Sequence, residues 1–64
     1  MRVNGRTVAV TENMSLKYFL EKEGYDVQRV VVERNGAVVR RGTFGTVMLS
    51  DDDRLEIVGF VGGG

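Results

Sequence analysis

Two Asn-Gly pairs constrain the fold of this 64-residue sequence more than any other feature. Asn4-Gly5 and Asn35-Gly36 each lie between short runs rich in β-branched residues. A two-residue turn of type I′ needs positive φ at both central positions, and Asn-Gly is a pair that tolerates this. The sequence therefore predicts one β-hairpin at the start of the chain and a second in its middle.

The alternation of apolar residues agrees with the registers that these turns impose. The expected pairs are Val3 with Arg6, Met1 with Val8, Val32 with Val39, and Glu33 with Val38. The expected inward faces are Met1, Val3, Val8 and Val10 in the first hairpin, and Val30, Val32 and Val39 in the second. Val31 and Val38 are left on the outer face. A slip of one residue would reverse every side chain, so this agreement supports the register.

One segment between the hairpins has helical periodicity. Its apolar stripe at i, i+3 and i+4 consists of Leu16, Phe19 and Leu20. Ser15 is the expected N-cap and Gly24 the residue after the C-cap, and Tyr18 is expected to be partly buried beside the stripe. A helix of only two to three turns is unstable alone, so it must pack on the sheet.

The last third of the chain is expected to hold a loop or short strand, a polar turn at Ser50 to Asp53, and a final strand over residues 54–61. Phe44, Val47 and Leu49 are expected to reach the core from the loop. In the final strand, Leu55, Ile57 and Gly59 point one way, and Glu56, Val58 and Phe60 the other. The pattern leaves open whether residues 41–48 cover the outer face or leave it free.

These elements predict an α+β fold: a mixed sheet of four or five strands with one helix packed across it. The helix is the right-handed crossover that lets the first and last strands run parallel as neighbours.

Composition argues against several classes of function. Nine basic residues balance nine acidic ones without a basic face, which does not favour a nucleic-acid binder. No histidine or cysteine is present, which removes the commonest general base, nucleophile and zinc ligands. Asp51 to Asp53 lack the spacing of a calcium loop and are expected to form a polar turn. With neither an apolar leader nor a long apolar run, the chain is expected to be cytoplasmic, without a membrane partner, and not an enzyme.

The end of the sequence, Phe60-Val61-Gly62-Gly63-Gly64, suggests a tail that another protein grips. Glycine has no Cβ, so Gly62 and Gly63 can enter a channel too narrow for other residues. We expect a single domain over residues 1–61 and a flexible tail over residues 62–64. The partner would hold the Gly64 carboxylate and dock against Val58, Phe60 and Val61. The alternative is an inert glycine tail.

The chain resembles the ThiS family, the sulfur carrier proteins of thiamine biosynthesis, over essentially its whole length. The residues that carry the resemblance are Leu49, Asp53, Leu55, Glu56, Ile57, Val58, Phe60, Val61, Gly62, Gly63 and Gly64, with the central hairpin VVVERNGAVVRR. The resemblance implies a β-grasp (ubiquitin-like) fold. Gly59 departs from the pattern, since a larger residue is usual there; it is expected to weaken the last strand or to let a partner's backbone approach.

The resemblance also implies a mechanism. A ThiF-type enzyme would adenylate the Gly64 carboxylate with ATP and magnesium, which the carrier itself does not bind. Sulfur from a cysteine-derived persulfide would then replace AMP, giving a thiocarboxylate that a ThiG-type thiazole synthase uses. Three alternatives stay open: a molybdopterin-synthase small-subunit type of sulfur carrier, a ubiquitin-like modifier, and a ubiquitin-like binding module with an inert tail.

Overall fold

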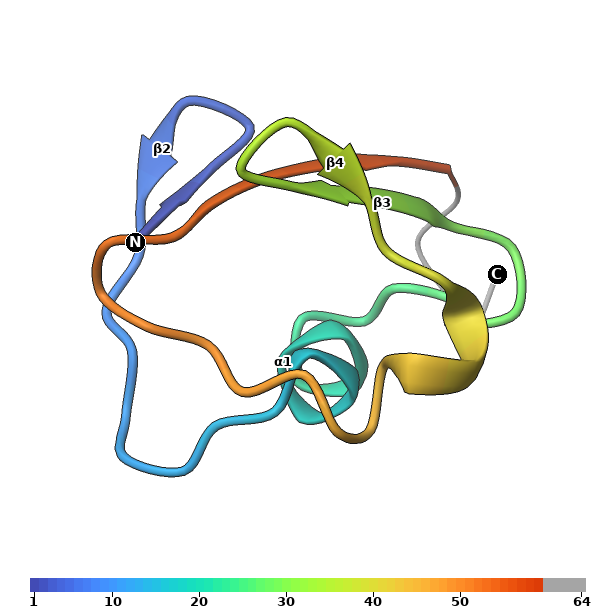
Figure 1. Cartoon of the computed structure of the whole chain (residues 1–64), viewed down its shortest axis with the longest axis horizontal. Helices are drawn as coiled ribbons and strands as arrows, with labels where there is room; N and C mark the ends of the chain where they lie inside the picture. The colour runs from blue at the N-terminus through green and yellow to red at the C-terminus, as the bar shows by residue number, and fades with distance from the viewer. Residues whose placement is uncertain (60–64) are drawn as a thin grey trace.

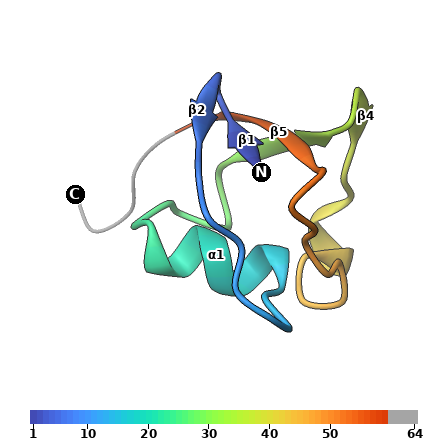
Figure 2. The ribbon, with the colours of Figure 1, turned by 90° about the vertical axis from the view of Figure 1, so that its left-hand side faces the viewer.

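The computed structural model describes residues 1–59 of the chain. The elements, in chain order, are β1 (Arg2–Val3), β2 (Arg6–Thr7), α1 (Leu16–Lys22), β3 (Val31–Arg34), β4 (Ala37–Val38), the 3₁₀ helix η1 (Arg41–Thr43) and β5 (Arg54–Val58). They form a five-stranded sheet in the order β2-β1-β5-β3-β4, with α1 across one face (Figures 1 and 2). β5 is the central strand and runs parallel to β1 and antiparallel to β3. The predicted mixed sheet with one helix is therefore confirmed.

Both hairpins have the register that their turns predict. Val3 pairs with Arg6 in the first and Glu33 with Val38 in the second. The turn residues Asn4 and Asn35 have φ of 50° and 53°, and the glycine after each also has positive φ. Because local backbone chemistry alone fixes these turns, they could be predicted without tertiary information.

Helix α1 begins and ends as predicted. The Ser15 hydroxyl accepts a hydrogen bond from the Tyr18 N–H at 3.0 Å, and Gly24 follows the C-cap with φ of 85°. The expectation that Tyr18 is partly buried is wrong, because its side chain is 52% exposed. At 3.6 residues per turn, Tyr18 lies about 200° around the helix from Leu16 and so faces away from the sheet.

The hydrophobic core fills the space between the sheet and α1. Its buried residues are Met1, Val3, Met14, Leu16, Phe19, Leu20, Val30, Val32, Phe44, Leu49, Leu55 and Ile57. The expected inward residues Val8, Val10, Val39 and Val47 are partly buried against it.

The segment from η1 to Leu49 packs on the helix side of the sheet. Its backbone carbonyls at Val47 and Phe44 accept hydrogen bonds from the N–H groups of Leu16 and Lys17, at 2.8 and 2.9 Å. Phe44 and Leu49 are buried as predicted. This placement answers the question that the pattern left open: residues 41–48 lie beside the helix (Figure 2), and the outer face of the sheet stays exposed at Val31, Val38 and Val58.

Candidate docking surface and the strand that carries it

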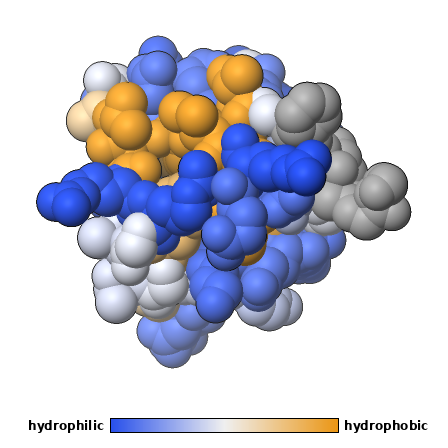
Figure 3. All heavy atoms as spheres, turned by 90° about the vertical axis from the view of Figure 1, so that its right-hand side faces the viewer, coloured by the Kyte–Doolittle hydropathy of each residue, from blue (hydrophilic) through white to orange (hydrophobic). Residues whose placement is uncertain are grey.

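The outer face of the sheet carries an exposed apolar patch at the C-terminal end of β5. Val58 pairs directly with Val31 across the strands, and Val38 lies on the neighbouring strand β4. These residues, here called the valine surface, are 70%, 50% and 68% exposed, in the order Val58, Val31 and Val38. Figure 3, which views the right-hand side of Figure 1, shows apolar side chains gathered in the upper part of the molecule, above a band of hydrophilic ones. Clustered exposed apolar side chains are typical of protein-binding surfaces.

The first turn holds β5 just before this surface through the side chain of Asn4. Its Oδ1 accepts a hydrogen bond from the Ile57 N–H at 2.7 Å, and its Nδ2 donates to the Ile57 carbonyl at 3.1 Å. Strand β1 ends at Val3, so the Asn4 amide takes the place that a further β1 residue would occupy in the parallel ladder. Asn4 is therefore both the turn residue and the partner of the end of β5.

The second turn holds the start of β5 in the same way. The Asn35 Oδ1 accepts from the Arg54 N–H at 2.9 Å, and the Asn35 N–H donates to the Arg54 carbonyl at 2.8 Å. The Asn35 Nδ2 also donates to Asp53 at 3.0 Å. The two turn asparagines thus hydrogen-bond to the central strand near its two ends, Asn4 from the side of β1 and Asn35 from the side of β3.

Asp53 anchors the turn that leads into β5. Asp53 is 5% exposed, and its carboxylate accepts hydrogen bonds from Asn35, from Arg34 Nε at 3.1 Å, and from the Ser50 N–H at 2.9 Å. Burial raises the pKa of Asp53, but the hydrogen bonds from Asn35, Arg34 and Ser50, with the charge of Arg34, outweigh burial and hold this pKa below its ordinary value. The charged form of Asp53 therefore stabilises the fold.

Gly59 ends the strand through a close approach within the chain. Its φ is 139°, and a Cβ at this position would lie 2.9 Å from the Cα of Val30 and 3.2 Å from the Arg29 carbonyl oxygen. β5 ends at Val58, so Gly59 is not part of the strand, and residues 60 and 61 of the predicted strand lie outside the described residues. The backbone that approaches Gly59 is that of Val30, which gives an intramolecular reason for glycine at this position.

The structure places Val58, of the predicted docking residues, on the exposed face. Phe60, Val61, Gly62, Gly63 and Gly64 lie outside the described residues, as does the predicted boundary between a domain ending at 61 and a tail. The side-chain roles of Asn4 and Asn35 and the burial of Asp53 were not predicted from the sequence. No local signal marks these roles, because each depends on a partner far away in the sequence.

Residues 1–59 contain no group of His, Cys, Asp or Glu side chains placed to hold a metal ion. Over the same residues, no helix is long and apolar enough to cross a membrane.

Comparison with protein families finds one match over the whole chain. The model of the ThiS family matches residues 1–64. The chain belongs to the ThiS family.

A solved relative supports this assignment. The crystal structure of the thiamine biosynthesis protein ThiS from Geobacter metallireducens superposes with a TM-score of 0.76 at 33% identity, over 98% of this chain and 96% of that one. The predicted β-grasp architecture of the ThiS family is thereby confirmed.

Two sequence relatives are much longer proteins named thiazole synthase. The protein from Magnetococcus marinus is 42% identical over 64 residues, and the protein from Paramagnetospirillum magneticum is 37% identical over 62 residues. These matches cover 100% and 97% of this ThiS-family chain but only 20% and 19% of the relatives. The chain therefore spans about a fifth of the length of each of the two.

Proposed function

We propose that this ThiS-family chain is a sulfur carrier of thiamine biosynthesis that acts through the carboxylate of Gly64. The observation that carries the proposal is the whole-chain family match, which includes the terminal Gly62-Gly63-Gly64. The fold supports it, because β5, the central strand of the sheet, carries Val58 of the valine surface near its end and precedes these glycines in the sequence.

The proposed chemistry needs no side chain of the carrier. A carboxylate oxygen of Gly64 attacks the α-phosphorus of ATP and releases pyrophosphate, with ATP and magnesium bound by a ThiF-type enzyme. The terminal sulfur of a cysteine-derived persulfide then displaces AMP, and a thiol cleaves the resulting acyl disulfide to leave the thiocarboxylate. A ThiG-type thiazole synthase takes this sulfur for the thiazole ring. The chain is then a substrate and donor, which is consistent with its lack of cysteine and histidine.

The carrier contributes binding energy at a distance from the reacting atom. The valine surface would dock on the partner, and Phe60 and Val61 would extend this contact toward the tail. Five residues follow Gly59, and at about 3.3 Å each they span at most about 17 Å. A partner can therefore bind the folded domain outside its active site and receive Gly64 within it, so that remote binding serves the chemical step.

The two relatives named thiazole synthase support a ThiG-type partner. Each contains a segment similar to this chain within a protein about five times longer. A carrier joined to its sulfur acceptor would need no separate encounter, because linkage raises the effective concentration of one for the other. We propose the cytoplasm as the compartment, since ATP and the persulfide donor are made there.

Adenylation of tail variants tests the proposal. The 64-residue chain is incubated with a ThiF-type enzyme, magnesium and ATP, and ATP–pyrophosphate exchange is measured. Exchange is expected with the native chain and is expected to be lost in Gly64→Ala or when alanine is added after Gly64. Circular dichroism of each variant checks that folding is unchanged.

Exchange that survives both tail changes would refute Gly64 as the site. In that case, binding that depends on Val58 and not on the tail would favour a ubiquitin-like binding module. If exchange is normal but no thiazole forms, the result would favour a molybdopterin-type carrier or a protein modifier as the function of the chain.

A further inference from the structure

Charged side chains lie in rows of like sign beside the valine surface. On the outer face of the sheet, Glu33 of β3 pairs directly with Glu56 of β5. One step further along β5, Arg54 pairs directly with Arg2 of β1. The outer face therefore runs, along the strands, from the valines through a pair of glutamates to a pair of arginines.

The two glutamates have no cationic partner among the described residues. The ion pairs found within residues 1–59 join Arg6 to Glu23, Arg29 to Asp26, and Arg34 to Asp53. Arg2 donates instead to the carbonyl of Gly5 in its own turn, at 2.8 Å. Like charges directly opposite on neighbouring strands destabilise a sheet, so Glu33 and Glu56 cost the free chain stability.

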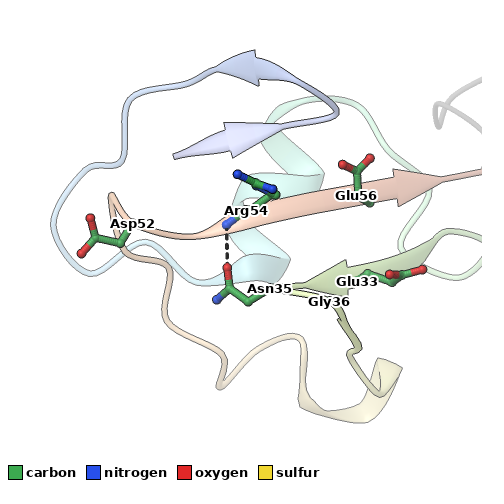
Figure 4. Close-up of a pocket in the computed structure, with 6 residues that line it drawn as sticks. All are labelled: Glu33, Asn35, Gly36, Asp52, Arg54 and Glu56. Atoms are coloured by element: carbon green, nitrogen blue, oxygen red, sulfur yellow. Dashed lines mark hydrogen bonds between the residues drawn. The ribbon is translucent and has the colours of Figure 1, made fainter.

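The glutamate pair borders a hollow on this face. The hollow is about 470 Å³ in volume and is lined by Glu33, Asn35, Gly36, Asp52, Arg54 and Glu56. Three carboxylates and one guanidinium give this lining a formal charge of −2. Figure 4 shows Glu33 on β3 and Glu56 on β5, and the one hydrogen bond drawn among the six residues joins Asn35 to Arg54. The hollow thus has room and negative charge beside an apolar patch.

We propose that Glu33 and Glu56 are the charged half of the docking surface, and that they receive an arginine or lysine side chain of the partner protein. The proposal rests on the proposed function. It requires that the partner protein present aliphatic side chains to the valine surface and a cation to the glutamate pair. A guanidinium is well suited, because it can donate to both carboxylates at once.

A second copy of this chain fits the face less well. Side chains on one face of a strand repeat every 6.6–6.8 Å or so. In a symmetric dimer packed through this face, the arginines of each copy could face the glutamates of the other. The same two-fold axis would then place each valine surface over the polar turn at Asp52. The apolar and charged rows can both be matched only by a different protein.

The proposal predicts an unusual double effect of neutralising the pair. In Glu33→Gln/Glu56→Gln the repulsion is removed, so the free chain should gain about 2–5 °C in Tm. The same variant should bind a ThiF-type enzyme or a ThiG-type synthase about tenfold or more weakly, since it loses a charge-assisted contact. A residue pair with a purely structural role would not weaken binding while it stabilises the fold.

The experiment measures Tm by circular dichroism and Kd by calorimetry with each of the two enzymes, at two salt concentrations. The matched control is Glu12→Gln/Glu21→Gln, which removes the same net charge from exposed positions in a loop and on α1. The control should bind like the native chain. Weaker binding by the Glu33/Glu56 variant to one enzyme or both, with a smaller salt dependence, supports the proposal.

Equal binding of the Glu33/Glu56 variant and the native chain would overturn this inference and leave the sulfur-carrier function standing. A native chain that binds neither enzyme would contradict the proposed function and this inference with it. Sedimentation of the free chain tests whether a second copy occupies this face. A dimer that dissociates in the glutamine variant would show that it does, which would contradict the proposal.

Discussion

Replacing Asn4 by glycine tests whether the first turn holds the end of β5 through its side chain. Glycine keeps the positive φ of this position, which is 50°, so the turn itself is preserved. The variant loses the two hydrogen bonds between the Asn4 amide and the Ile57 backbone, at 2.7 and 3.1 Å. Each is worth about 1 kcal/mol net. We expect a loss of about 1–2 kcal/mol after the small gain from relieving the left-handed conformation.

This loss is large for a chain of this size. At roughly 0.05–0.15 kcal/mol per residue, the whole domain is stable by only about 3–10 kcal/mol. The expected fall in Tm is therefore about 5–15 °C. Urea unfolding followed by circular dichroism gives the free energy of unfolding, and hydrogen exchange gives the protection of the Ile57 amide.

Asn13 provides the matched control. It also has positive φ, of 60°, but its side chain makes no hydrogen bond to the described residues. Asn13→Gly should change stability by less than about 0.5 kcal/mol. If Asn4→Gly were as stable as Asn13→Gly, with unchanged exchange at Ile57, the reasoning that assigns Asn4 a role as a strand partner would be refuted.

Two further predictions concern the ends of β5. Asp53→Ala leaves the donors of Arg34, Asn35 and Ser50 without their acceptor and should cost about 2–4 kcal/mol in urea unfolding; a cost under about 0.5 kcal/mol would contradict the anchor. Because the pKa of Asp53 is lowered on folding, its ionised form stabilises the fold above the unfolded pKa of about 4, and this contribution is lost as the pH falls through the folded pKa. The stability difference between the native chain and Asp53→Asn should therefore shrink between about pH 5 and pH 2, and a constant difference would count against the shift. Gly59→Ala should cost about 1–3 kcal/mol, whereas Gly42→Ala, where a Cβ meets nothing within 4 Å, should be near neutral; equal effects would remove the steric argument.

The sequence was sufficient to predict the parts of the fold that local chemistry decides. Asn-Gly fixed both hairpins and their registers, and the spacing of Leu16, Phe19 and Leu20 fixed the helix. The parallel pairing of β1 and β5 followed because a helix crossover favours it. These features need only neighbouring residues and the alternation of apolar side chains.

The parts that the sequence could not predict depend on distant partners. Asp53 was expected in a polar turn, and its burial requires Arg34 and Asn35, which are 19 and 18 residues away. The need for glycine at position 59 comes from the backbone of Val30, which only the folded sheet brings near. Tyr18 was expected beside the apolar stripe, but its angle of about 200° from Leu16 around the helix leaves it exposed.

Some features of the candidate docking surface could likewise be predicted from local pattern, whereas others depend on tertiary packing. Alternation along the final strand was enough to place Val58 on the outer face with Val31 and Val38. Whether the η1 segment covered that face depended on tertiary packing against α1, and so did the pairing of Glu33 with Glu56. The glycine tail suggested that a partner holds Gly64, and family resemblance added the chemistry at its carboxylate; both stay predictions.

The most direct test of the proposed sulfur-carrier function is the intact mass of the 64-residue chain after incubation with a ThiF-type enzyme, ATP, magnesium and a persulfide donor. We predict a gain equal to sulfur replacing one oxygen, located in the C-terminal peptide that ends at Gly64. An unchanged mass, obtained with an enzyme and donor shown to be active on another carrier, would contradict the claim that this chain carries sulfur on its terminal glycine.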